Sequence, residues 1–586
     1  HERLSKRLAL AVFSSDALSS VAYATEEILL VLTLAGAVMV SYSIPLSLSI
    51  IGLLIILTMS YRQIIFEYPE GGGAYIVGKS NLGEWPGLVA AAALMIDYVL
   101  TVAVSVAAGM AALISAVPAL LPHREALCVA AILLVTVVNL RGVRESGQFF
   151  AVPTYIFIAT IAAMLGVGAV QILFGHAARV EPLPSMAPTE PLTLFLLLRA
   201  FSSGCTALTG VEVISNGVSA FKKPEPKNAA FTMIGMAAIL GTMFIGISAM
   251  AYYFGIVPKE DETVVSQIAR ATFGTGPLYF LVQASTMVIL ILAANSSFNG
   301  FPRLASILAR DSYMPHQMSM MGDRLVFSNG VIILGVFSCL LIVLFNGDTH
   351  ALIPLYAVGV FLSFTISQAG MVKRWLVKKG PHWEKKLLVN GIGAVTTAIA
   401  TLIIASTKFA HGAWIVIVLI PLLITFFRAI RSHYKAVSEQ VALSRGHRPP
   451  MPRRNIVVLP IGGVNRAVIR AVDYARSRSG DIRAVLVDVD PEETARVEIQ
   501  WAQWGCGVPL TVLPSPYRSV LSSLLDYLEQ VLQKDQECWV TVVIPEILPA
   551  RWWQNILHNQ RAFMLKGALL FKDRVILTDV PYHLTR

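Results

Sequence analysis

The chain has 586 residues, of which 55% are hydrophobic and 14% charged, and its mean hydropathy is +0.66. This composition excludes a water-soluble globule and a single domain, and indicates an integral membrane protein. The net charge of +10 would suit nucleic acid, but most basic residues lie in short loops between apolar runs. Positive charge in such loops sets membrane topology, so we expect no nucleic-acid partner.

Apolar segments of membrane length fill the first three quarters of the chain. A window of about 19 residues gives twelve of them between residues 8 and 430. Lys and Arg concentrate in the tail and in every second loop, which predicts that both termini are cytoplasmic. No small-residue cleavage site follows the first apolar run, so a membrane helix is expected there and not a signal peptide. We expect the transmembrane part to span residues 1–432.

Two of the twelve segments are poor helices in their middles. The first contains "SSDALSSVAYA" and the sixth "RAFSSGCTALTGVE", in which serine, threonine and glycine weaken the apolar helix. They hold corresponding positions in two five-helix halves, a pattern that points to a transporter site near the bilayer midplane. Unwound backbone there would free carbonyl oxygens for cations and amide groups for anions. The alternative is that small residues only permit close helix packing.

Three acids lie inside apolar stretches: Asp16, Asp97 and Glu212. Each must be paired, protonated or bound to a cation to remain in a membrane. Burial and like charge both disfavour ionisation, so at least one carboxyl is expected to keep a proton near neutral pH and exchange it as a cation moves. The alternative is permanent pairing with a base, for which Arg199, about three turns before Glu212, is the candidate.

The third segment adds hydroxyl groups to this set. Asp97, Thr101 and Ser105 are spaced i, i+4, i+8, which places a carboxylate and two hydroxyls on one helical face. Hard alkali cations prefer such oxygen ligands. Alternatively, the hydroxyls bond only to their own helix. Tyr23 and Tyr356 also lie in membrane segments, where a tyrosine more often only satisfies a hydrogen bond in packing.

The pattern changes after the last span. A basic helix and a Pro-rich linker are expected over residues 433–453, followed by the short apolar runs "NIVVLPI", "IRAVLVDVD", "PLTVLP", "CWVTVVIP" and "RVILTDV". These runs alternate with helical stretches, which predicts a parallel sheet covered on both faces. Residues 454–586 are therefore expected to form a cytoplasmic α/β domain with a dimerising or regulatory role.

The sequence contains few motifs of the kind that enzymes use. The Gly462–Gly463 pair follows the first expected strand, where α/β folds bind ligands, but the longer phosphate-binding pattern is missing. A simple turn is favoured there, with nucleotide binding as the alternative. The five cysteines are scattered without metal or redox spacing. The membrane half contains no nucleophile–base–orienter set, so we expect neither an enzyme nor a cofactor.

Long strings of this sequence resemble a known superfamily. "SSGCTALTGVEVISNGVSAFKKPEPKNA", "FEYPEGGGAYIVG" and "AANSSFNGFPRLASILARDSYMP" are similar to the sixth segment, first inner loop and eighth segment of the amino acid/polyamine/organocation (APC) superfamily. The resemblance covers about the first 430 residues and implies a LeuT-like fold of inverted five-helix repeats within twelve transmembrane helices. "SSDALSSVAYATEEIL" resembles the KimA-type potassium/proton symporters, whereas amino acid permeases usually carry a Gly-rich segment where this chain has Asp16.

This resemblance implies a secondary active importer of potassium, coupled to protons, in a bacterial plasma membrane. It also implies a homodimer joined through cytoplasmic domains similar to universal stress proteins, and inhibition by cyclic di-AMP. The carried-over ion-binding residues are Asp16, Tyr23, Asp97, Tyr98, Thr101, Ser105, Thr209, Glu212 and Tyr356. Potassium itself would be held by Asp16, Asp97, Thr101, Ser105, Thr209 and Glu212.

Two other functions stay open at this point. An amino acid or polyamine permease of the same superfamily would also use the intramembrane acids, because an ammonium group is a cation. A membrane receptor would pass a signal to the α/β domain without transport.

Overall fold

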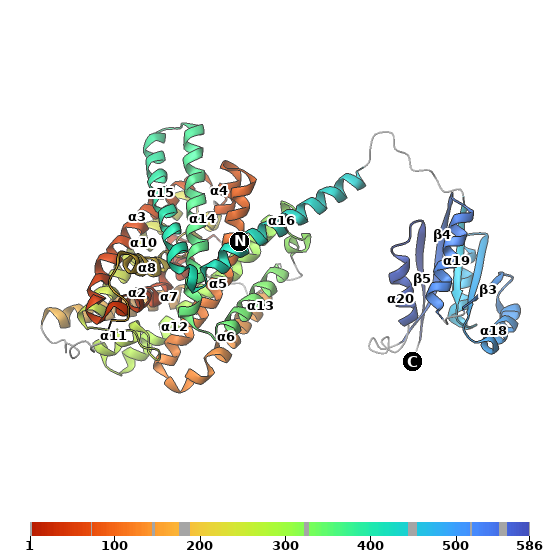
Figure 1. Cartoon of the computed structure of the whole chain (residues 1–586), viewed down its shortest axis with the longest axis horizontal. Helices are drawn as coiled ribbons and strands as arrows, with labels where there is room; N and C mark the ends of the chain where they lie inside the picture. The colour runs from red at the N-terminus through yellow and green to blue at the C-terminus, as the bar shows by residue number, and fades with distance from the viewer. Residues whose placement is uncertain are drawn as a thin grey trace. The chain divides into compact units, whose positions relative to one another are not determined.

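The computed structural model describes residues 3–71, 73–142, 147–174, 188–321, 327–442, 454–515, 519–549 and 560–584. The chain divides into two compact units, His1–Val441 and Ala442–Arg586. The first unit is helical, and the second is built around a β-sheet (Figure 1).

Apolar helices make up the first unit. Among the described residues, 11 helical stretches are long and apolar enough to cross a membrane. In chain order the helices are α1 (Lys6–Ser19), α2 (Val21–Leu32), α3 (Ser43–Glu67), α4 (Ala74–Asn81), α5 (Glu84–Ala116), α6 (Arg124–Leu140), α7 (Gly147–Leu173), α8 (Leu194–Gly204), α9 (Val213–Asn216), α10 (Glu225–Tyr253), α11 (Val264–Phe273), α12 (Pro277–Arg310), α13 (Ser328–Leu344), α14 (Thr349–Lys378), α15 (Trp383–Lys408) and α16 (Ala413–Val441).

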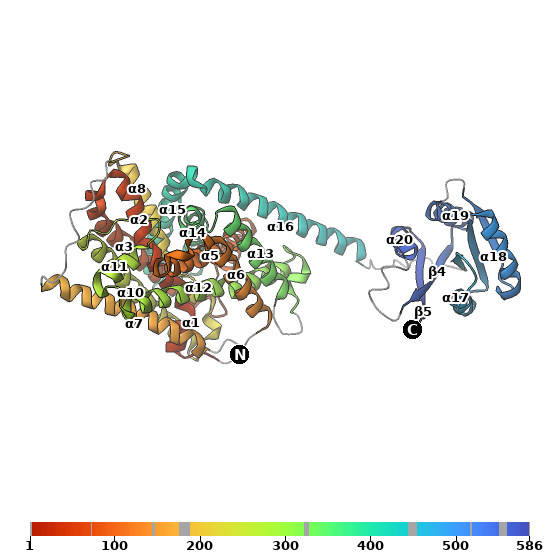
Figure 2. The ribbon, with the colours of Figure 1, turned by 90° about the horizontal axis from the view of Figure 1, so that it is seen from below.

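One predicted segment is shorter than the others. It corresponds to α13, which has 17 residues and lies beside α6 (Figures 1 and 2). At 1.5 Å per residue α13 is about 26 Å long, the lower limit for crossing a bilayer. The described residues therefore contain eleven helical stretches of membrane-spanning length and one shorter apolar helix.

Helix α5 forms the centre of the membrane unit. It is buried along most of its 33 residues and packs against α12 and α14. Small residues allow this close approach: a Cβ on Gly359 of α14 would lie 3.2 Å from the carbonyl oxygen of Ala93. Because α5 carries Asp97 and the two hydroxyls that follow it, this packing places the predicted polar face inside the helix bundle.

The second unit is an α/β domain with the predicted strands. Its sheet has five parallel strands in the order β3-β2-β1-β4-β5. The strands are β1 (Arg454–Ile461), β2 (Asp481–Asp488), β3 (Leu510–Pro514), β4 (Cys538–Leu548) and β5 (Val575–His583), and the helices are α17 (Arg466–Arg476), α18 (Pro491–Trp504), α19 (Val520–Lys534) and α20 (Gln560–Leu569).

Helices cover both faces of this sheet, as the apolar strands required. Val468 of α17 and Trp501 of α18 pack in one core, whereas Leu528 of α19 and Leu569 of α20 pack in the other. Figure 2 shows α17 and α19 on opposite sides of the strands. Between the two units, α16 remains helical to Val441, and residues 443–453 of the expected linker lie outside the described residues.

Candidate functional site

The first membrane segment is interrupted at a single residue. α1 ends at Ser19 and α2 begins at Val21, while Ser20 itself keeps helical angles (φ −62°, ψ −23°). The Ser20 hydroxyl lies 2.6 Å from the carbonyl oxygen of Ala17 and 3.1 Å from that of Ala207. The break is therefore narrow, and the Ser20 side chain contacts the sixth segment.

The sixth segment is interrupted more deeply. α8 passes into a short 3-10 turn over Cys205–Leu208, after which Thr209 is extended and Gly210 has a φ of 77°. Glycine adopts this conformation without the penalty that a side chain would bring. A Cβ on Gly210 would lie 2.8 Å from both the backbone nitrogen of Ala17 and Cγ of Asp16. The unwound backbone thus lies directly against Asp16.

The three predicted acids are buried where these segments meet. Asp16, Asp97 and Glu212 are 8%, 9% and 7% exposed. The charge of Asp97 interacts with those of Glu212 and Asp16, and Glu212 also interacts with Asp16. The ion pairs found among the described residues include none of the three. Three carboxyl groups are therefore gathered here without a paired base.

Neutral side chains hold two of these acids. Ser296 of α12 donates to Asp16 Oδ2 at 3.4 Å. Glu212 Oε2 accepts from Tyr61 of α3 at 3.3 Å and from Ser363 of α14 at 3.5 Å. Because hydroxyl donors carry no charge, these contacts orient the carboxyl groups and leave their charge uncompensated.

The third acid has an oxygen without a partner. Within the described residues, Oδ1 of Asp97 is buried and accepts no hydrogen bond. Such a group is costly unless a proton, a water molecule or a cation occupies the space beside it. Asp97 Oδ1 is therefore available to a proton or a cation.

Arg199, the base expected to pair with Glu212, contacts other residues. Arg199 lies 3.4 Å from Glu190 Oε1 through Nη1 and 2.9 Å from His411 Nε2 through Nη2. It is not hydrogen bonded to Glu212, whose described partners are Tyr61 and Ser363. The alternative of a Glu212–Arg199 pair is therefore wrong.

Hydroxyl groups from four segments surround the acids. Thr101 donates to the hydroxyl of Tyr356 at 3.0 Å, so it bonds across to α14 and not to its own helix. Tyr23 of α2 interacts with Thr209, which is fully buried and donates to the carbonyl oxygen of Thr206 at 2.8 Å. Ser105 is buried one turn beyond Thr101 on α5. These contacts join the third segment to the tenth and the first segment to the sixth.

The remaining predicted residue, Tyr98, is half-buried. A Cβ on Gly300 would lie 2.5 Å from its ring, which shows that the ring packs closely on α12. Its hydroxyl group interacts electrostatically with Glu212 and Asp97. Tyr98 interacts with Asp16 as well, so it belongs to the acid cluster and joins it to α12.

Sequence reasoning missed the hydroxyl partners of Glu212 and Asp16. Tyr61 is the only tyrosine in α3, and it falls on the apolar face that includes Leu54, Leu57 and Ile64. A single polar residue on such a face could have identified it. Ser363 and Ser296 resemble many other membrane serines, so no sequence signal separates them.

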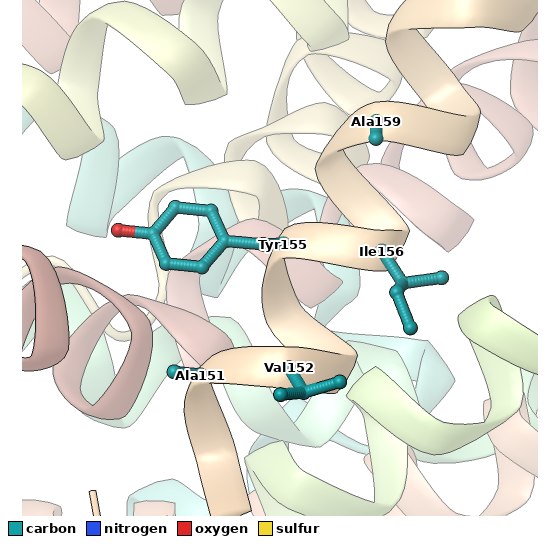
Figure 3. Close-up of a pocket in the computed structure, with 5 residues that line it drawn as sticks. All are labelled: Ala151, Val152, Tyr155, Ile156 and Ala159. Carbon is teal, nitrogen blue, oxygen red and sulfur yellow. The ribbon is translucent and has the colours of Figure 1, made fainter. Parts of the chain in front are cut away.

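A groove on α7 offers different chemistry. It has a volume of about 400 Å³ and is lined by Ala151, Val152, Tyr155, Ile156 and Ala159 on neighbouring turns (Figure 3). Val152 is 62% exposed and the lining is almost wholly apolar. Such a surface suits lipid chains and offers a cation no ligands.

Two family models together match almost the whole chain. The amino acid permease model matches residues 6–427, and the KimA potassium transporter C-terminal domain matches residues 453–582. The fold and the acid cluster thus occur in a transporter of the APC type, which confirms that the protein is not an enzyme.

A full-length relative shows the family to which the chain belongs. The potassium transporter KimA of Bacillus subtilis is 45% identical over 585 residues, which cover 99% of this chain and 96% of that protein. The chain therefore belongs to the KimA potassium transporter family.

More distant proteins share the membrane unit. The low-affinity putrescine importer PlaP of Escherichia coli is 22% identical, covering 55% of this chain and 71% of that protein. The human Asc-type amino acid transporter 1 is 24% identical, covering 57% and 64%. Among solved structures, a Na⁺-coupled sialic acid symporter matches 69% of this chain and 90% of its own chain at 15% identity, with a TM-score of 0.41.

Proposed function

We propose that this protein is a secondary transporter that imports potassium together with protons. The observation that carries the proposal is the buried, unpartnered Oδ1 of Asp97 beside Asp16 and Glu212. An alkali cation suits this position because it prefers carboxylate, hydroxyl and carbonyl oxygens. Membership of the KimA family supports potassium as that cation.

The potassium ligands in this proposal come from both broken segments and from α5. Carboxylates offset the charge of the ion, and hydroxyl and carbonyl oxygens replace its water shell. The ligands are Asp16, Asp97, Thr101, Ser105, Thr209 and Glu212, with Tyr23, Tyr98 and Tyr356 around them.

Proton coupling follows from the charge of the cluster. Three carboxyl groups without a paired base resist full ionisation, because each negative charge disfavours the others. A potassium ion and a proton therefore compete for the same negative charge, and their binding is linked. The proton affinity belongs to the cluster as a whole.

Flux measurements on the purified protein test this function. In proteoliposomes with an imposed pH gradient, we expect potassium uptake with matching proton entry. Asp97→Asn should abolish both, whereas Glu84→Gln at the exposed start of the same helix should retain them. If Asp97→Asn and Glu212→Gln both still took up potassium, the assignment of the site would be wrong.

A polyamine or amino acid permease remains the second candidate. It is favoured by the acids, which would also bind an ammonium group, and by the likeness to a putrescine importer. Competition separates the two functions: excess putrescine should leave potassium uptake unchanged. Amine flux without potassium flux in the same vesicles would assign the acids to a permease site, and absence of any flux would favour a receptor.

We also propose that α13 is the twelfth span and that the helices form inverted repeats with both termini in the bacterial cytoplasm. The basic loops on one side support this orientation. Labelling of single cysteines at residues 381 and 411, which follow α14 and α15, tests it. Only the second should react with an impermeant reagent in intact cells.

We propose that the α/β domain has a fold similar to universal stress proteins. In this proposal it joins two chains into a homodimer and binds cyclic di-AMP, which inhibits transport. Its strand order reverses between β1 and β4, and such a switch point is where parallel sheets bind ligands. A Cβ on Gly462 or Gly463 after β1 would meet nothing within 4 Å, so this turn is open. Mass measurement in detergent and equilibrium binding of cyclic di-AMP to the full chain test both roles.

A further inference from the structure

A histidine lies between two buried glutamates at some distance from the potassium ligands. Glu26 and Glu27 of α2 are 3% and 4% exposed. Nδ1 of His350, in the first turn of α14, lies 2.6 Å from Glu27 Oε1, and Nε2 lies 3.7 Å from Glu26 Oε1. The second oxygen of Glu26 accepts from the backbone N–H of Val264 at 3.3 Å. The imidazole therefore joins α2 to α14.

Water reaches this cluster through a cavity. A cavity of about 670 Å³ opens beside His350, and its wall includes Glu125, Glu260, Asp348 and Arg124. The His350 side chain is 40% exposed, whereas those of the two glutamates behind it are only 4% and 5% exposed. The imidazole is thus the point where solvent meets the buried carboxyl groups. Because acids outnumber bases on the wall, the cavity attracts cations and protons.

The charge of this cluster depends on the imidazole proton. Lys408 of α15 is 5% exposed, interacts with Glu27 and donates to the hydroxyl of Ser203 at 2.5 Å. With Lys408 charged and His350 neutral, Glu26 and Glu27 leave one negative charge uncompensated. A proton on the imidazole removes this excess, and a buried net charge is costly. Proton binding therefore stabilises the contact between α2 and α14.

The other charged groups around the cluster have roles of their own. Asp348 caps the N-terminus of α14. Glu262, just before α11, lies 3.0 Å from Arg270. On α8, Arg199 lies 3.4 Å from Glu190. None of these contacts supplies a second cation to the two buried glutamates.

The helices joined by His350 are also those that carry two tyrosines of the proposed potassium site. Tyr23 lies four residues before Glu27, so the two share one face of α2. Tyr356 lies less than two turns after His350 on α14. Each helix thus connects the histidine cluster to the proposed potassium site within two turns.

We propose that His350, with Glu27 and Glu26, forms a proton-binding site at the outer end of the transport path. A proton from water in the cavity adds to the imidazole, ties α2 to α14 and closes the path above a bound ion. Loss of that proton leaves the buried carboxyl groups uncompensated and releases the contact. The inference rests on the proposed import of potassium with protons and on the proposed orientation.

The test is the dependence of potassium uptake on external pH in cells that express the full chain. The midpoint is the pH at which half of the His350 imidazoles carry the added proton. In the wild type, initial uptake should fall as pH rises above this midpoint, by up to about tenfold per pH unit, the slope that one proton gives. His350→Gln keeps a hydrogen-bond donor for Glu27 but cannot add a proton, so uptake should stay near the wild-type level at high pH and fall less steeply as pH rises; the dependence that remains comes from the proton bound at the acid cluster. His123→Gln changes an exposed histidine next to Arg124 of the cavity wall and should retain the wild-type profile.

The outcomes separate this inference from the proposed function. A His350→Gln protein that reaches the membrane with the wild-type uptake rate at low pH and the wild-type pH profile overturns the inference. Should this variant not reach the membrane, Glu26→Gln provides the test. Removal of one negative charge should move the midpoint of the pH profile by about one unit to lower pH. A midpoint that does not move would overturn the inference. Absence of potassium uptake in the wild type would instead overturn the proposed function.

Discussion

The first and sixth membrane segments are both interrupted, but to different depths. In the first, only Ser20 separates two helices and the angles remain helical. In the sixth, Thr209 is extended and Gly210 has a positive φ, so the helix is lost between Leu208 and Val213. The difference indicates that the first segment mainly contributes side chains to the site, whereas the sixth also contributes free backbone.

The sharpest test of this asymmetry is Gly210→Ala. A methyl group there meets a strained conformation and contacts of 2.8 Å with Asp16 and Ala17. We expect a penalty of about 3 kcal/mol, which corresponds to an uptake rate reduced by about 100-fold. Initial rates of rubidium or potassium uptake measure it. Gly52→Ala, in open space on α3, is the control and should leave the rate unchanged; an active Gly210→Ala protein would contradict the deep break.

The second largest effect is expected for Tyr61→Phe. This change removes a donor from the carboxyl group of Glu212, which follows the deep break. A hydrogen bond to a charged group contributes about 1.5 kcal/mol, so the apparent potassium affinity should fall by about tenfold. Concentration dependence of uptake measures this change. Tyr42→Phe, at a tyrosine that is 38% exposed, should show none.

A smaller effect is expected at the shallow break. Ser20→Ala removes the hydroxyl that contacts the carbonyl oxygens of Ala17 and Ala207. One neutral hydrogen bond contributes about 1 kcal/mol, so uptake should fall by about fivefold. Ser49→Ala, which loses only a local bond on exposed α3 surface, is the matched control. A loss as large as that of Gly210→Ala would show that the two breaks are equivalent.

The smallest effect is expected for Ser296→Ala. The hydroxyl lies 3.4 Å from Asp16 and bonds more closely, at 2.7 Å, to the carbonyl oxygen of Ala293. Since the contact with Asp16 is long, the apparent affinity should change by less than about twofold. The same uptake curves measure it, and a tenfold loss would mean that Ser296 is a direct partner of the ion.

The contrast between the breaks was only partly readable in the sequence. Glycine and hydroxyl residues weaken both segments, and this composition predicted both interruptions. It did not distinguish their depth, because the Ser20 hydroxyl bonds to Ala207, which lies far away in the sequence. Tertiary contacts of this kind have no signature in local spacing.

The same limit applies to the partners of the acids. Helical periodicity placed Thr101 on the face of Asp97, but not opposite Tyr356 of a distant helix. Charge suggested Arg199 as a partner of Glu212, whereas the helix packing presents Tyr61 and Ser363 to that acid. The strands of the α/β domain were easier to predict, because continuous apolar runs bounded by turns have few other structures available.

The short helix α13 has a consequence for the surrounding lipid. As the proposed twelfth span, of about 26 Å in a hydrocarbon layer of about 30 Å, α13 would be shorter than the layer around it. The bilayer beside it would then thin, at a cost of a fraction of a kcal/mol per Å. Lipids with shorter acyl chains would remove that cost, so we expect membrane thickness to modulate this transporter by acting on α13 and, through it, on α5 and α6, against which it packs.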